Sequence, residues 1–227
     1  MQRLWSGSVR DLLVTGTDTG VGKTVIAAAL VSALRSRGVR AIGFKPVETG
    51  IRADEDSDSE VLARASDERT VIAQPLLRLP EPLAPAVAAE RAGVELDPDA
   101  IEARIRELRR EGYTVVVEGA GGVMVPLGWG FNVLDIAQSC DLDAVVVARA
   151  GLGTLNHVAL TVMVLRSREI PIRGIVLNGR SDSPDLAEST NPAALSRMLH
   201  GVRVVEVPHV LTSDPVQSAA QIVSRLL

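Results

Sequence analysis

The sequence contains a single cysteine, Cys140, among its 227 residues. One cysteine excludes an intramolecular disulfide and any metal or cluster site built from several cysteines of one chain. Aromatic residues make up only 2% of the chain. This scarcity argues against a platform of ring side chains on which nucleic acid bases would stack. A reducing, cytoplasmic compartment is the expectation for such a chain.

Long apolar runs and an excess of basic charge are also missing. No apolar stretch approaches about 20 residues, the length that spans a bilayer, so no membrane segment is predicted. Residues 1–10 carry two arginines with no signal-type apolar stretch after them, and we expect a short N-terminal extension there. The net charge is −4, and nucleic acid is therefore not expected as a partner.

Apolar residues are plentiful, at 46% of the chain, and strand-like and helix-like segments alternate without a repeat or linker. This alternation predicts an α/β fold, a single domain over residues 1–227 with a mostly parallel sheet flanked by helices on both faces. Residues 78–85 are expected to form an extended connection, and residues 182–191 a loop. We expect strands near 12–15, 39–44, 114–118, 144–148, 170–178 and 202–207. Helices are expected near 25–37, 59–65, 86–92, 97–111, 133–139 and 192–199, with another that follows the Gly-rich turn at 149–157 and runs to about 168, and a final helix after the last strand.

A Gly-rich segment, Gly16-Thr17-Asp18-Thr19-Gly20-Val21-Gly22-Lys23-Thr24, follows the first predicted strand and precedes a helical run. Strand, loop and helix in this order are typical of a phosphate-binding loop. Backbone N–H groups there form an anion cradle, Lys23 supplies a charge for the β- and γ-phosphates, and Thr24 suits a Mg²⁺ ion. Five residues separate Gly16 from Gly22, one more than the common pattern has. An ordinary Gly-rich turn is the alternative.

A second motif, Lys45-Pro46-Val47-Glu48-Thr49-Gly50, follows the strand predicted at 39–44. Ligands of open parallel sheets bind outside the carboxyl ends of the strands, so Lys45 and Thr49 are expected beside the phosphate loop. A simple surface turn is the alternative. Four acidic residues lie between 51 and 58, and Asp58, at the mouth of the next helix, is the candidate Mg²⁺ ligand. Another acid of that loop remains open for this role.

Glu118 comes directly after three valines and before a Gly-rich turn expected at 119–122. Nucleotide enzymes with a phosphate loop place an acidic Mg²⁺ partner at this point; a solvated Glu118 is the alternative. Further on, Asn178 ends a predicted strand and carries the donor and acceptor needed to read a purine edge. Another Gly-rich turn, 151–156, precedes a helix whose N-terminus can bind a carboxylate or phosphate.

In combination, the motifs at 16–24, 45–50, 118–122 and 151–157 resemble the dethiobiotin synthetase family. The match runs in order from Leu12 to the last helix, and the lengthened loop is the family's own form. The resemblance implies an ATP- and Mg²⁺-dependent ligase of biotin biosynthesis that acts on 7,8-diaminononanoate and CO₂ or bicarbonate. One amine takes up CO₂ as a carbamate, the γ-phosphoryl group moves to it, and the second amine closes the cyclic urea.

The resemblance also implies roles for individual residues. Lys45, Lys23 and Thr17 would be catalytic, and Thr24, Asp58 and Glu118 would bind Mg²⁺. The substrate would contact Thr49, Gly151, Leu152, Gly153, Thr154 and Asn156. ATP would contact Gly20, Val21, Gly22, Lys23, Thr24, Val25, Asp58, Glu118, Gly119, Ala120, Gly121, Asn178, Gly179, Pro208, His209 and Val210.

The family works as a homodimer, and residues 151–156 match the stretch that holds the substrate carboxylate from the neighbouring subunit. Some members carry a lysine near the start of this turn, where this chain has Ala150 and Gly151. The group that balances the substrate carboxylate is therefore left open.

Three other classes compete with this interpretation. Partitioning or septum-site ATPases commonly carry a second lysine early in the loop, where this chain has Thr17. Cobyrinate and cobyric acid amide synthetases normally add a glutaminase domain, for which this chain lacks the length. A binding module without catalysis is the third. ATP turnover that depends on the diamine separates the ligase from the switch and the binding module.

Overall fold

The computed structural model describes residues 10–51, 56–67, 74–209 and 214–227. Its elements are, in chain order, β1 (Leu12–Gly16), α1 (Lys23–Ser36), β2 (Ala41–Phe44), β3 (Val47–Thr49), α2 (Asp58–Ala65), β4 (Leu77–Leu79), α3 (Pro85–Ala92), α4 (Pro98–Arg110), β5 (Thr114–Gly122), β6 (Pro126–Gly128), β7 (Phe131–Asn132), α5 (Val133–Ser139), β8 (Asp143–Arg149), α6 (Thr154–Ser167), β9 (Ile172–Arg180), α7 (Leu186–Met198), β10 (Val204–Pro208), α8 (Pro215–Val223) and the 3₁₀ helix η2 (Ser224–Leu226).

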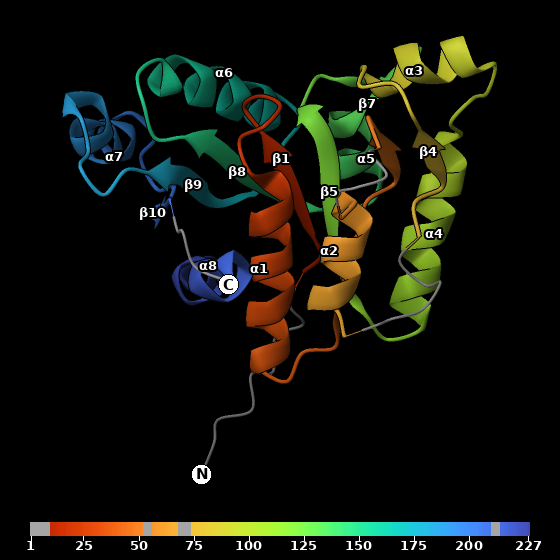
Figure 1. Cartoon of the computed structure of the whole chain (residues 1–227), viewed down its shortest axis with the longest axis horizontal. Coiled ribbons are helices and arrows are strands. Elements are labelled where there is room, and N and C mark those ends of the chain that lie inside the picture. The colour runs from red at the N-terminus through yellow and green to blue at the C-terminus, as the bar shows by residue number, and fades with distance from the viewer. Residues whose placement is uncertain (1–9, 52–55, 68–73, 210–213) are drawn as a thin grey trace.

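Six strands form one sheet in the order β10-β9-β8-β1-β5-β2, and every neighbouring pair in it is parallel. Figure 1 shows β1 between β5 and β8, with α1 and α8 side by side on one face. Because all six strands run the same way, their carboxyl ends meet at one edge, where ligands of such sheets bind. The predicted α/β fold with a parallel sheet is confirmed.

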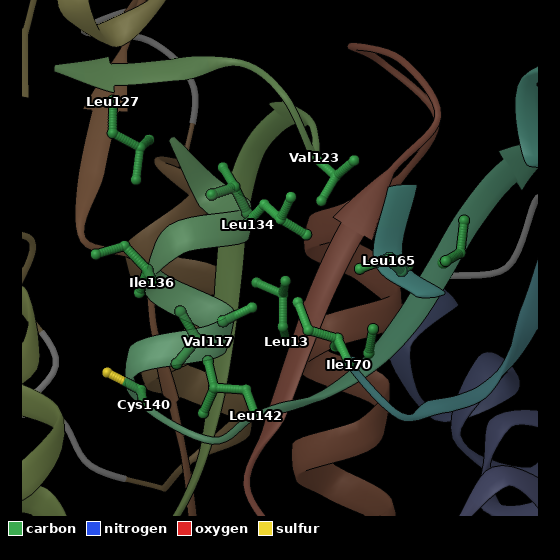
Figure 2. Packing of buried hydrophobic residues seen from close by; sticks show 14 of the residues in the cluster. Leu13, Val117, Val123, Leu127, Leu134, Ile136, Cys140, Leu142, Leu165 and Ile170 are labelled. Carbon is green, nitrogen blue, oxygen red and sulfur yellow. The ribbon is translucent and has the colours of Figure 1, made fainter. Parts of the chain in front are cut away.

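Both faces of the sheet are buried, which explains the near-continuous apolar strands. Leu12 and Val14 of β1 pack into a cluster with residues of α1, α2 and α8. Leu13 points to the other face and joins a cluster with residues of α3 to α7. Figure 2 shows Leu13 and Val117 in this second cluster, facing Leu134 of α5. Helices therefore cover both faces, as the sequence predicted.

The turn predicted at 119–122 is wrong, because β5 continues through Gly122. Here two segments approach too closely for side chains. A Cβ on Gly119 would lie 2.9 Å from Cγ1 of Val133, and one on Gly16 would lie 3.0 Å from the carbonyl oxygen of Gly121. The glycines allow β5 to run beside the phosphate loop, and Gly16 pairs with Gly122 after a register shift between Val14 and Gly16.

Two further connections differ from expectation. The loop predicted at 182–191 is helical from Leu186, where a capping box between Asp185 and Glu188 begins α7 and carries it through Pro192. The capping box fixes the start of the helix at Leu186, and the helix accommodates Pro192, which has no backbone N–H to donate, in its interior. Part of the extended connection at 78–85 is a strand, since β4 pairs in parallel with β3. The sequence also did not predict the small hairpin of β6 and β7.

Within the described ranges, no helix is long and apolar enough to cross a bilayer.

Candidate active site

The phosphate loop joins β1 to α1 and includes two glycines with positive φ angles. Gly20 and Gly22 have φ angles of 71° and 92°, a region that glycine adopts without steric cost. Gly22 is the N-cap of α1 and contributes no side-chain cap, so the first N–H groups of the helix are available to an anion. The ammonium of Lys23 donates to the carbonyl oxygen of Asp18 over 3.0 Å, which holds the lysine along the loop.

Lys45 lies at the carboxyl end of β2 and points toward the phosphate loop. Its Nζ donates to Oε1 of Glu118 over 2.8 Å and also to Oδ2 of Asp58. Lys23 and Lys45 are each 7% exposed. Burial lowers the pKa of Lys23, and the charge of Lys45 lowers it further, whereas Glu118 and Asp58 raise it. Lys23 directly precedes Thr24, whose hydroxyl bonds with Asp58 and Glu118, the two carboxylates that Lys45 also contacts. Both lysines therefore stand beside the same pair of carboxylates.

Three oxygen-bearing side chains converge beside these lysines. The hydroxyl of Thr24 lies 2.8 Å from Oδ1 of Asp58 and 2.9 Å from Oε1 of Glu118. The other oxygen of Glu118, Oε2, is buried and has no hydrogen-bond partner among the described residues. Hard oxygen donors suit Mg²⁺, which takes one or two carboxylates and completes its shell with water and substrate phosphates.

The residues present thus fit a magnesium ion. The described part of the chain holds no cluster of three or more His, Cys, Asp or Glu side chains that could hold a metal ion.

Burial and neighbouring charges shift the pKa values of Lys45, Asp58 and Glu118 in different directions. Burial would lower the pKa of Lys45, but Glu118 and Asp58 raise it above its ordinary value. Burial would raise the pKa of Asp58, but the charge of Lys45 brings it below its ordinary value. Burial dominates for Glu118 and raises its pKa, because this carboxylate is the most enclosed of the three groups. Lys45, whose pKa is raised, therefore contacts one carboxylate with a lowered pKa, Asp58, and one with a raised pKa, Glu118.

A cavity of about 530 Å³ opens beside the phosphate loop. Residues of the phosphate loop line it together with Asn178, Pro208 and His209, which are among the residues expected to contact ATP. Asn178 donates to the carbonyl oxygen of Val21 over 2.9 Å, and a Cβ on Gly22 would lie 2.1 Å from its amide nitrogen. Val210 is outside the described residues. The predicted residues in the lining are Gly20, Val21, Gly22, Val25, Gly151, Leu152, Asn178, Gly179, Pro208 and His209.

The cavity lining also includes residues that sequence reasoning missed: Arg149, Ala150, Glu188, Val207 and Pro215. Arg149 pairs with the carboxylate of Asp18 over 3.2 Å, so it joins the end of β8 to the phosphate loop. Its place directly before the Gly-rich turn at 151–156 was an available signal. Glu188 falls within the loop predicted at 182–191, but in the structure it lies in the first turn of α7 and lines the cavity.

The remaining predicted residues lie at different depths. The backbone of Thr17 is bonded to Val147 of β8, and Thr49 ends β3 half-buried. Gly153 begins α6 with a φ of 93°. Thr154 is 5% exposed and its hydroxyl has no partner among the described residues. Asn156 is exposed on the first turn of α6. Gly119, Ala120 and Gly121 continue β5 past Glu118.

Comparison with known proteins assigns the family. The model of a family described as an AAA domain matches residues 10–217. A protein of Anaeromyxobacter dehalogenans (strain 2CP-C) named ATP-dependent dethiobiotin synthetase is 45% identical, with 85% of this chain and 86% of that protein covered. A protein of the same name from Haloferax mediterranei is 41% identical over 95% of this chain and 91% of its own length. This chain belongs to the dethiobiotin synthetase family.

Solved structures show how widely the fold of the dethiobiotin synthetase family is shared. The septum site-determining protein MinD of Pyrococcus horikoshii, in complex with Mg-ADP, has a TM-score of 0.59 at 18% identity, with 96% of this chain and 93% of that chain covered. A Cyanothece McdA–ATP complex has a TM-score of 0.56 at 14% identity, covering 96% and 90%. These likenesses show the fold alone. The family assignment rests on the sequence relatives, whose identity is above 40%.

Proposed function

We propose that this chain is an ATP- and Mg²⁺-dependent dethiobiotin synthetase that carboxylates 7,8-diaminononanoate and closes the cyclic urea, in the cytoplasm. The observation that carries the proposal is the meeting of Lys23, Lys45, Thr24, Asp58 and Glu118 at the mouth of the phosphate loop. Phosphoryl transfer depends on positioning and charge neutralisation more than on covalent chemistry, and this group of side chains supplies both.

Thr24, Asp58 and Glu118 would hold Mg²⁺, which neutralises charge on the nucleotide phosphates when it is bound. The cradle at the start of α1 and Lys23 would bind the phosphates themselves. The cavity lined by Asn178 and Pro208 would receive the base.

Lys45 changes partners in this proposal. In the structure its ammonium is bonded to both Glu118 and Asp58. These two carboxylates would hold Mg²⁺, and Lys45 would then donate to the oxygens of the γ-phosphate and the carbamate. The carbamate oxygen attacks the γ-phosphorus and ADP leaves. The second amine then attacks the carbamate carbon, loses a proton and expels phosphate as the ring closes. Thr17 and Thr49 would hydrogen-bond the carbamate.

The substrate carboxylate would be held at the start of α6, across a homodimer. Gly151 to Asn156 lead into this helix and begin it, and the hydroxyl of Thr154, which has no hydrogen-bond partner among the described residues, supports a polar ligand there. An apolar stripe runs along α6 from the same end: Leu160 and Met163 are 48% and 60% exposed. Residues three and four apart share one helix face, so Asn156, Leu160 and Met163 face the same way. This stripe supports a second copy of the chain as the covering partner.

The test is mass spectrometry of products after incubation with the diamine, bicarbonate, Mg²⁺ and ATP. We expect dethiobiotin, ADP and phosphate in equal amounts, with ADP formation dependent on the diamine. ATP hydrolysis that ignores the diamine would instead favour a nucleotide switch, and ATP binding without turnover would favour a binding module.

A further inference from the structure

Glu48 is a buried carboxylate to which the proposed reaction gives no task. It lies on β3 between Lys45 and Thr49 and is 3% exposed. Three donors surround it: the backbone N–H of Ser59 over 2.6 Å, the hydroxyl of Ser59 over 3.0 Å and Nε of Arg78 over 3.2 Å. Burying a charged carboxylate costs solvation free energy, and its hydrogen-bond partners must offset that cost. The partners of Glu48 therefore indicate its role.

The first partner fixes the end of a helix. Ser59 is the second residue of α2, and Asp58, the expected Mg²⁺ ligand, is the first. The backbone N–H that Glu48 receives is one of the unpaired donors at a helix N-terminus, where a negative charge is favourable. Glu48 therefore fastens the first turn of α2 to β3, directly beside Asp58.

The second partner holds Glu48 in place. Arg78 on β4 stands opposite Glu48 in the parallel β3–β4 pair. Its Nη2 also donates to the hydroxyl of Ser59 over 2.8 Å. Glu48, Ser59 and Arg78 thus form a closed ring of contacts that joins β3, β4 and α2.

The helix does not need Glu48 in order to form. Ser57 and Glu60 make a complete capping box at the same end of α2, in which each side chain accepts from the backbone N–H of the other residue. The contact with Glu48 therefore fixes where the first turn of α2 lies and is not needed for the helix to form. Since Asp58 bonds with both Thr24 and Lys45, the position of this first turn sets where its carboxylate stands in the site.

We propose that Glu48, with Arg78, is a positioning residue that holds the first turn of α2 so that Asp58 reaches the metal–nucleotide site. This inference rests on the proposed function only in taking Asp58 as a metal ligand. Its deciding measurement is therefore metal binding, which needs no diamine, and turnover is measured beside it.

The experiment measures Mn²⁺ affinity by calorimetry on the full chain saturated with the β,γ-imido analogue of ATP. Glu48→Ala is expected to weaken Mn²⁺ binding about tenfold, as the loss of a group that orients a metal ligand does. The affinity for the analogue without metal stays unchanged. The Mg²⁺ concentration for half-maximal turnover rises in parallel, while the KM for the diamine does not move.

Two further variants separate positioning from general damage. Glu60→Gln removes an equal charge from the same first turn without touching β3, and it should keep the Mn²⁺ affinity of the unchanged chain. Combining Glu48→Gln with Arg78→Met keeps an acceptor for the N–H of Ser59 and removes the unpaired cation, and it should recover most of the affinity lost in Glu48→Ala. Equal losses in Glu48→Ala and Glu60→Gln would overturn the proposal.

Glu48→Asp, whose carboxylate is one methylene shorter, carries the test if the alanine variant does not fold. It is expected to lose part of the affinity, and an unchanged Mn²⁺ affinity would overturn the inference. Asp58→Asn identifies which proposal fails. If it binds Mn²⁺ normally, the ligand assignment in the proposed function is wrong. If it binds weakly while Glu48→Ala binds normally, only the role of Glu48 is wrong.

Discussion

The two ends of the parallel sheet both bury carboxylates, but these carboxylates differ in how many of their oxygens have a hydrogen-bond partner. At the amino end, Asp11 accepts from the backbone of Val115 with one oxygen and from Arg109 with the other. Asp143 there pairs one oxygen with Arg10 and the other with Arg173. At the carboxyl end, Glu118 shares one oxygen between Thr24 and Lys45 and leaves the other without a partner among the described residues.

The cations differ as well. The chain has 24 basic residues, of which only Lys23 and Lys45 are lysines, and both lie at the carboxyl end. Every cation of the amino-end pairs is an arginine. A guanidinium matches a carboxylate with fixed, directed donors, whereas an ammonium is a compact charge that exchanges partners readily. Both carboxylate oxygens of Asp11 and Asp143 have protein partners at the amino end. At the carboxyl end, the exchangeable ammonium of Lys45 and the oxygen of Glu118 that lacks a partner among the described residues suit the binding of a ligand.

The largest expected effect comes from removing the exchangeable cation. Lys45→Met should lower dethiobiotin formation about 10³-fold, because a donor aimed at developing charge is lost. Nucleotide affinity should mostly survive, since Lys45 lies outside the phosphate loop. Product formation and equilibrium nucleotide binding are measured side by side. Near-normal turnover would show that Lys45 is merely structural, like the arginines of the amino end.

The same chemical change at the two ends should give opposite results. Glu118→Gln should weaken Mg²⁺-dependent turnover while leaving thermal stability nearly unchanged, because the lost carboxylate was incompletely paired. Asp11→Asn should cost about 2 kcal/mol of unfolding free energy, a figure reduced because Arg109 is partly exposed, and leave turnover intact. Urea unfolding and Mg²⁺ titrations of turnover check both variants. A stable Asp11→Asn chain with altered turnover would contradict the proposal that the amino-end carboxylates serve stability and the carboxyl-end ones serve the reaction.

Local spacing predicted the part of the site that is continuous in sequence. The phosphate loop and Lys45 each follow a strand, and Glu118 follows the three buried valines of β5; a parallel sheet necessarily brings such positions together at one edge. Contacts between distant segments were not predictable in this way. Glu48 was only an unassigned position in a motif, because its partner Arg78 lies 30 residues away on a strand that was expected to be an extended connection. Glu188 reaches the cavity because a capping box starts α7 ahead of its proline.

Amine labelling offers the finest comparison, because the chain has no lysines besides the two in the site. Both are equally enclosed, at 7% exposure, so their charge states decide their rates. Burial lowers the pKa of Lys23, whereas the carboxylates raise that of Lys45. A lower pKa leaves more neutral, nucleophilic amine at a given pH. An acylating reagent at pH 8 should therefore modify Lys23 several-fold faster than Lys45, with ATP protecting Lys23. Peptide mass spectrometry measures both rates, and faster labelling of Lys45 would mean that its two carboxylates do not hold it in solution.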